Sequence, residues 1–201
     1  MAGFQCIAAT GKSLERLINA CFTEQSPIPD GDATVRAVLI RTDDLEQIGG
    51  SGNVITPPAL SIFLYRVDFN KAMRAGWSAV GSLNGRAYLP LDLHFMITPW
   101  ASNAEHELQI LGRAMQCLEE HPSLTGPLLS EDGGWAPGDS VQVVMEEVPT
   151  EAVMRTFDSL PHDYKLSVPY VARVVRLDSL HAAPPTETVT VIAGLTPAPA
   201  P

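Results

Sequence analysis

Two polar side chains inside an apolar strand pattern, Asp92 and His94, are the residues best placed for chemistry. They alternate with apolar residues in LPLDLHFMITP, so on a strand both would lie on the same face. Glu105, His106 and Glu107 follow shortly afterwards. A carboxylate beside an imidazole can form an acid–base pair or part of a metal site. The other interpretation, which we favour, is a polar sheet face that meets solvent, a neighbouring subunit or the start of a helix.

The familiar sequence motifs of catalysis and cofactor binding are missing from the chain. HExxH does not occur, and no second histidine lies four residues from His106. The GGSG stretch at 49–52 has neither the lysine of a phosphate-binding loop nor the GxGxxG order. GxSxG is also absent, and Cys117 lies in a helical pattern whose neighbours indicate packing. We therefore expect no catalytic residue, no cofactor-binding residue, no metal ligand and no cofactor.

Charge and composition indicate which classes of partner the chain is not expected to bind. The 201 residues include 23 acidic and 13 basic side chains, which gives a formal net charge of −10. Binding to phosphate groups requires a surplus of Lys and Arg, so neither nucleic acid nor an anionic membrane is expected as a partner. No stretch approaches the roughly 18 apolar residues of a membrane span, and the N-terminus lacks the pattern of a signal peptide.

The three cysteines, Cys6, Cys21 and Cys117, form an odd set without CxxC spacing. All three fall in helical patterns. We expect them to be buried free thiols in a reducing cytoplasm.

Hydrophobic periodicity divides the chain into helices and strands separated by polar or glycine-rich connections. Apolar residues recur at helical spacing from Phe4 to Phe22, from Ala104 to Leu118 and from Val153 to Leu160. Strand patterns cover residues 35–40, 59–69, 89–97, 140–147, 166–177 and 187–192. The longer connections, at residues 43–53, 71–86 and 122–139, are expected to be loops.

Local signals set the expected ends of these elements. Pro90 suits the beginning of a strand, and Pro99 is expected to end that strand. Ser102 and Glu105 have the spacing of a capping box, so we expect Ser102 to cap the helix that follows. Thr150 is expected to cap a short helix.

The order of these elements predicts an α+β fold, with a single mixed, largely antiparallel sheet and helices on its faces. The strand at 59–69 is apolar on both sides, which is typical of a central strand, and residues 89–97 are its expected antiparallel neighbour. Pro169, inside the strand pattern at 166–177, favours an edge position or a bulge for that strand.

The chain divides into one domain and a C-terminal tail. Residues 1–180 form the predicted α+β domain, residues 181–195 a linker with a candidate extra edge strand, and residues 196–201 a disordered Pro/Ala tail. The strand pattern at 187–192 either pairs with a partner protein or lies within its own sheet, and we favour the second.

Four segments carry a resemblance to a known family. They are LSIFLYRV, LPLDLHFMITPWA, ELQILGRAMQCLEEHP and YKLSVPYVARVVRLDS, at residues 60–67, 89–101, 107–122 and 164–179. In order and spacing they resemble the tail-terminator, or cap, family of extracellular contractile injection systems, which are phage-tail-like particles of the antifeeding-prophage type. One departure is that family members often have a Leu-Trp pair before the last long strand, where this chain has MRTFDSLP with Phe157 as the aromatic residue.

The resemblance implies a phage tail-terminator-like fold over residues 1–180 and a structural role. Members form a homohexameric ring that closes the distal end of the inner tube and contacts the sheath. The implied partners are copies of the chain and the inner tube and sheath proteins, with no nucleic acid, no membrane and no catalysis. Assembly in the cytoplasm is implied, with later release of the particle left open. The alternatives are a soluble enzyme, or a small-molecule or metal-binding protein, using the Asp92/His94 face, and an adaptor or baseplate component of the same particle.

Overall fold

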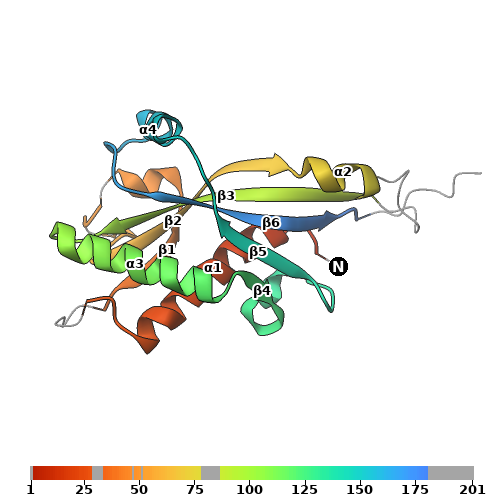
Figure 1. Ribbon diagram of the computed structural model, residues 1–201, viewed down its shortest axis with the longest axis horizontal. Coiled ribbons are helices and arrows are strands. Elements are labelled where there is room, and N and C mark those ends of the chain that lie inside the picture. The colour runs from red at the N-terminus through yellow and green to blue at the C-terminus, as the bar shows by residue number, and fades with distance from the viewer. Residues whose placement is uncertain (1, 29–33, 47, 51, 78–86, 181–201) are drawn as a thin grey trace, which may run out of the picture.

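A computed structural model describes the chain except for residues 1, 29–33, 47, 51, 78–86 and 181–201. One six-stranded sheet in the order β1-β2-β3-β6-β5-β4 forms the centre of the molecule (Figure 1). The strands are β1 (Arg36–Ile40), β2 (Ala59–Phe69), β3 (Tyr88–Trp100), β4 (Ser123–Thr125), β5 (Ser140–Met145) and β6 (Val168–Asp178). β1 and β2 are parallel and the other neighbours are antiparallel, which confirms the predicted mixed sheet.

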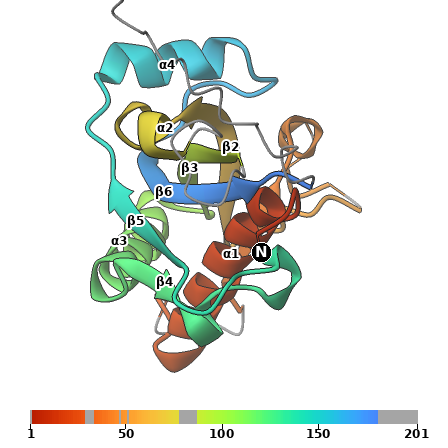
Figure 2. The same cartoon turned by 90° about the vertical axis from the view of Figure 1, so that its right-hand side faces the viewer.

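Helices cover both faces of the sheet. They are α1 (Cys6–Glu24), α2 (Lys71–Trp77), α3 (Ala104–Glu120) and α4 (Thr150–Asp158), with short 3-10 turns at Thr42–Leu45, Gly126–Leu128 and Glu131–Gly133. Figure 1 shows α1 and α3 beneath the sheet, and Figure 2 shows α4 above it on the opposite side. The arrangement confirms the predicted α+β class.

The main core lies between the sheet and the helices α1 and α3. Leu14 and Ile18 of α1 are fully buried against the inward side chains of β2 and β3, which include Leu60 and Leu93. Burial of each such side chain contributes about 1.5–3 kcal/mol to stability. The apolar stripe at helical spacing therefore fixes which face of α1 meets the sheet.

The opposite face of β3 is also covered, contrary to the mixed face that strict alternation indicates. Met96 packs against Val153 and Phe157 of α4, and His94 and Thr98 on the same side are buried as well. A helix that comes 50 residues later in the chain supplies this cover, so the strand's own pattern does not reveal it.

Several expected element ends were wrong. Pro99 lies inside β3, opposite Leu60, and is tolerated there because β6 pairs with β3 only as far as Ile97. The expected loop at 71–86 begins with α2, and the one at 122–139 contains β4.

The capping residues also differ from the expectation. The cap of α3 is Asn103, whose Oδ1 accepts a hydrogen bond from the His106 N–H at 2.8 Å, rather than Ser102. Asparagine caps a helix as well as serine does, and the two candidates are adjacent in the chain, so their residue types do not show which one is the cap. Thr150 is the first residue of α4, after Pro149 at the cap position, and makes no side-chain cap bond.

Pro169 lies in a central strand, which was not expected. β6 runs between β3 and β5, and the register change in its pairing with β3 falls between Leu91 and Leu93, far from Pro169. β5 pairs with β6 only from Tyr170 onward, so the missing N–H of Pro169 lies just outside that ladder. The strand pattern at 187–192 and the tail lie outside the described residues.

The outer edge of β1 and the part of β2 that extends beyond β1 are covered differently. On β1, the Asn19 side chain occupies the edge, because its Oδ1 accepts from the Ala37 N–H at 2.9 Å and its Nδ2 donates to the Ala37 carbonyl at 2.8 Å. β1 pairs with β2 only as far as Phe63. Within the described residues, the segment 64–69 of β2 thus has a strand partner on its β3 side alone.

Candidate functional site

The polar face predicted around Asp92 and His94 lies on the α4 side of the sheet. In the pairing of β2 with β3, Arg66 lies opposite His94, and Asp68 lies opposite Asp92. The register shifts between Leu64 and Arg66, so one extra residue in β2 puts these charged side chains on the histidine's face.

His94 is enclosed by charged neighbours, with 6% of its side chain exposed. Its Nδ1 lies 2.7 Å from Glu146 Oε2, and its Nε2 lies 3.4 Å from Asp68 Oδ2. Arg66 contacts both carboxylates at 3.0 Å, through Nη2 to Glu146 and through Nε to Asp68. Glu146 follows β5 in the chain, so this closed network joins β2, β3 and the segment that leads to α4.

Asp92 does not take part in this network. Both of its carboxylate oxygens accept from Asn70 Nδ2 at 3.1 Å. Asp92 and His94 share a strand face as predicted, but they have separate partners and form no acid–base pair with each other in the structure.

Tyr65 borders the network through a weak hydrogen bond of 3.4 Å from its hydroxyl to Glu146 Oε2. Burial, with the nearby negative charge of Glu146, raises the pKa of Tyr65 to about 12. The hydroxyl is therefore a donor at ordinary pH. The network links side chains of β2 and β3 with Glu146, which follows β5.

The other candidate residues are separated from this face. Glu107 Oε1 accepts from Lys165 Nζ and from the Ala101 N–H, and so ties the start of α3 to the segment before β6. The backbone of His106 takes part in the helix cap, while Glu105 is exposed. The acidic and histidine residues of 92–107 therefore do not converge on one site.

The cysteines differ from the expected free thiols. Cys21 of α1 and Cys117 of α3 form a disulfide, with their Cα atoms 6.1 Å apart. Each residue lies on the apolar stripe of its helix, and packing of α1 against α3 brings the two together across 96 residues. Cys6 remains a free buried thiol, and burial raises its pKa to about 11.

His121 lies beside this disulfide. The ligand atoms of Cys21, Cys117 and His121 all lie within 4.8 Å of one another, which is the one group of three possible metal ligands among the described residues. The two sulfur atoms are bonded to each other, so neither is a thiolate that could bind a metal.

Several large apolar side chains are exposed, at positions that the sequence did not mark as surface. The large ones are Phe4, Val54, Val67, Phe69, Met73, Leu108, Met145, Met154, Tyr164, Leu166 and Leu180. Periodicity does not reveal their exposure, because exposure depends on which neighbours arrive from elsewhere in the chain. Among the described residues, no helix is both long and apolar enough to cross a membrane.

The fold is similar to that of chains in two solved structures. A chain from "Cryo-EM structure of the anti-feeding prophage cap (AFP tube terminating cap)" is similar with a TM-score of 0.51 and 17% identity, over 94% of this chain and 60% of that one. A second chain, described as "PVC sheath/tube terminator in extended state" of an extracellular contractile injection system, is similar with a TM-score of 0.49 and 18% identity, over 94% of this chain and 65% of that one. This chain therefore spans less than two thirds of the length of either.

The search of curated proteins found no significant match. A family model does match: residues 9–190 match the family described as "Pvc16 N-terminal domain". That range includes every helix and strand of the structure except the first turn of α1. The chain belongs to the Pvc16 N-terminal domain family and has a terminator-like α+β fold.

Proposed function

We propose that this protein is a structural cap that closes the distal end of the inner tube, and contacts the sheath, of a contractile injection system. The observation that carries the proposal is the family match over residues 9–190, together with a fold similar to that of a tube-terminating cap. The proposed partners are the inner tube and sheath proteins and further copies of this chain.

The physical basis of capping is geometry. A stacked tube presents the same interface at each layer, so it grows until a protein covers that interface without repeating it. A closed homohexameric ring meets this need when each subunit contacts the next through two different surfaces and the rotation closes. We propose such a ring here, assembled in the cytoplasm with the rest of the particle.

A non-catalytic role fits the polar face. His94, the side chain best suited to acid–base chemistry, is 6% exposed, with its Nδ1 2.7 Å from Glu146 Oε2. A general base must come within hydrogen-bond reach of its substrate, and little of this buried side chain is open to one. We propose no catalytic residue, metal ligand or cofactor site for this face.

Deletion of the gene in a producing strain tests the proposal. We expect tubes of uncontrolled length or unstable sheaths, measured by electron microscopy, and recovery of uniform particles when the chain is supplied again. Particles of unchanged length and form would contradict the cap role. Labelled protein found at the baseplate end rather than at the distal end would favour an adaptor component instead.

A further inference from the structure

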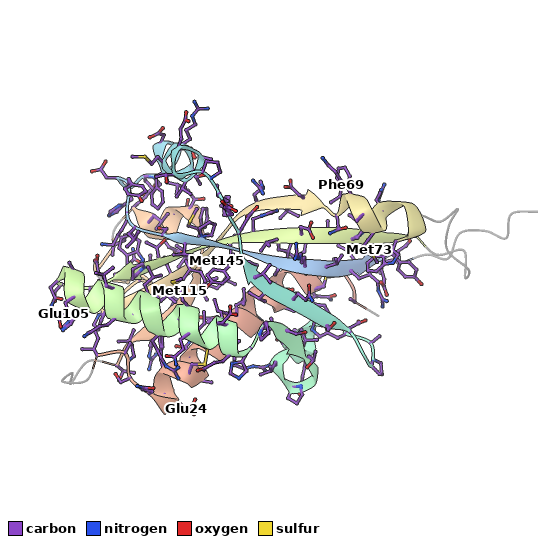
Figure 3. The ribbon with its side chains drawn as sticks, in the orientation of Figure 1. Glu24, Phe69, Met73, Glu105, Met115 and Met145 are labelled. Atoms are coloured by element: carbon purple, nitrogen blue, oxygen red, sulfur yellow. A yellow bond between two sulfur atoms is a disulfide. The ribbon has the colours of Figure 1, made fainter. Side chains whose placement is uncertain are left out.

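The C-terminal ends of α1 and α3 bring two sulfur atoms and an imidazole together. Cys21 belongs to the last turn of α1, which ends at Glu24, and Cys117 belongs to the last turn of α3. His121 is the C-terminal cap residue of α3. The two sulfur atoms and one ring nitrogen of His121 all lie within 4.8 Å of one another. In Figure 3, Glu24 lies below α3, on the side where the disulfide joins the two helices.

The hydrogen bonding of His121 leaves one ring nitrogen with a lone pair. Its Nδ1 lies 3.0 Å from the carbonyl oxygen of Cys117. A carbonyl oxygen can only accept, so Nδ1 donates and carries the proton, and in the neutral ring the lone pair is on Nε2. Histidines that bind metals commonly donate their other ring N–H to a backbone carbonyl or a carboxylate. Cys117 and His121 are also four residues apart, a spacing that puts both on one face of a helix.

The electrostatic surroundings of these residues favour a cation. The C-terminal end of a helix carries a partial negative charge, and neither α1 nor α3 has a basic residue in its last turn. The guanidinium of Arg113 donates to the Cys21 carbonyl at 3.2 Å, and it lies 3.7 Å from Glu24 and 3.6 Å from Glu120. Two carboxylates therefore face this one guanidinium, and the sum of these three side-chain charges is negative.

The disulfide is one redox form of this cluster. A thiol reductant converts the Cys21–Cys117 disulfide to two thiols and is itself oxidised to a disulfide, in a two-electron exchange. Zn²⁺ can then displace one proton from each thiol, and two thiolates with a neutral imidazole are ligands that zinc prefers. Both cysteines are buried, which disfavours two thiolates without a partner, whereas a bound zinc ion neutralises both charges.

We propose that Cys21, Cys117 and His121 bind one Zn²⁺ ion when the disulfide is reduced. A water molecule completes four-coordination, as in other zinc sites with three protein ligands. His121 is partly exposed, so the ion can enter at the helix ends. The ion would link α1 to α3 in a reducing compartment. Transfer of two electrons from the thiolates to a disulfide-bonded oxidant would re-form the disulfide and release the zinc.

Metal titration of the full chain in both redox forms tests this site. The protein is reduced with a phosphine, desalted without oxygen, and titrated with Zn²⁺ by calorimetry and with Co²⁺ by absorbance. We expect one Zn²⁺ per reduced chain with a dissociation constant below about 1 μM, and a thiolate-to-cobalt charge-transfer band with Co²⁺. Oxidised wild type has no thiolate at this place and should bind Zn²⁺ roughly a hundredfold more weakly or not at all. Zinc should raise the melting temperature of the reduced form alone.

Matched variants identify the ligands. Cys21→Ser/Cys117→Ser removes both thiolates and should abolish the cobalt charge-transfer band. His121→Gln keeps both thiols and should weaken zinc binding more than about tenfold, because loss of an outer-shell partner alone commonly costs that much. Cys6→Ser and His106→Gln should bind as wild type does, because Cys6 is outside the cluster and His106 is in the first turn of α3.

Three results would overturn the zinc site. They are reduced wild type that takes up no more zinc than oxidised wild type, His121→Gln that binds zinc as tightly as wild type, and loss of zinc binding in Cys6→Ser. The comparison of redox forms uses the wild-type chain, so it decides the question even where the double serine variant does not fold. The titrations use the isolated chain, so their result is independent of the cap role.

Discussion

Loss of the Cys21–Cys117 disulfide should weaken the fold substantially. The disulfide closes a loop across 96 residues, and chain entropy for a loop of that length corresponds to about 4.7 kcal/mol of stabilisation at 25 °C. That value is an upper figure, because residual structure in the reduced, unfolded chain lowers it. For a domain of this size, such a loss should lower the melting temperature by roughly 8–20 °C.

The assay is thermal and urea unfolding with and without a thiol reductant. Reductant should destabilise the wild type and the Cys6→Ala variant by similar amounts, since Cys6 is a free thiol. A Cys21→Ala/Cys117→Ala variant should begin at the lower stability and respond to reductant little or not at all. Titration of the unreduced, denatured wild type should find one reactive thiol.

Two results would refute this reasoning. Three reactive thiols in unreduced protein would show that Cys21 and Cys117 are not bonded to each other. One thiol together with unchanged stability on reduction would show that packing of α1 against α3 already restricts the chain without the covalent link.

Three further predictions concern the α4 side of the sheet. Glu146→Ala leaves His94 and Arg66 without their shared carboxylate and should cost about 1–3 kcal/mol in urea unfolding, whereas a change within error would show that the network is not structural. Phe157→Ala removes a contact of α4 with Met96 and should speed hydrogen exchange in α4 far more than in α1. An equal increase in both helices would show that α4 does not open independently of the main core. The pKa of Tyr65 is raised in the folded state to about 12, so folding favours the protonated hydroxyl. The stability that this protonated side chain contributes is complete below pH 10 and is lost as the pH rises toward about 12. Tyr65→Phe should flatten that alkaline decline in unfolding free energy, and an unaltered decline would assign it to other groups.

Local pattern was enough to identify most helices and strands. The alternation in 59–69 and 89–97 predicted two antiparallel neighbours, and the structure pairs them from Ala59 with Trp100 to Phe69 with Leu91. Such patterns are reliable because neighbouring residues on a strand point to alternate faces wherever the strand lies. The family resemblance was read from the same segments, and the family match confirms it.

Element ends were harder to predict, because single residues compete for them. Asn103 and Ser102 are both good caps, and the chain uses the later one. Pro99 and Pro169 each lie where a neighbouring strand happens to stop, which depends on pairing partners far away in the sequence.

By itself, the sequence determined the fold class, the central strand pair and the shared face of Asp92 and His94. Only the tertiary structure decided what that face does, because Glu146 arrives from beyond β5 and an extra residue in β2 sets Arg66 opposite the histidine. It also decided that two cysteines 96 residues apart meet, and that Phe69 and Met145 stay exposed. Periodicity records which side of its own element a residue occupies, whereas contacts and exposure depend on which other elements cover that side.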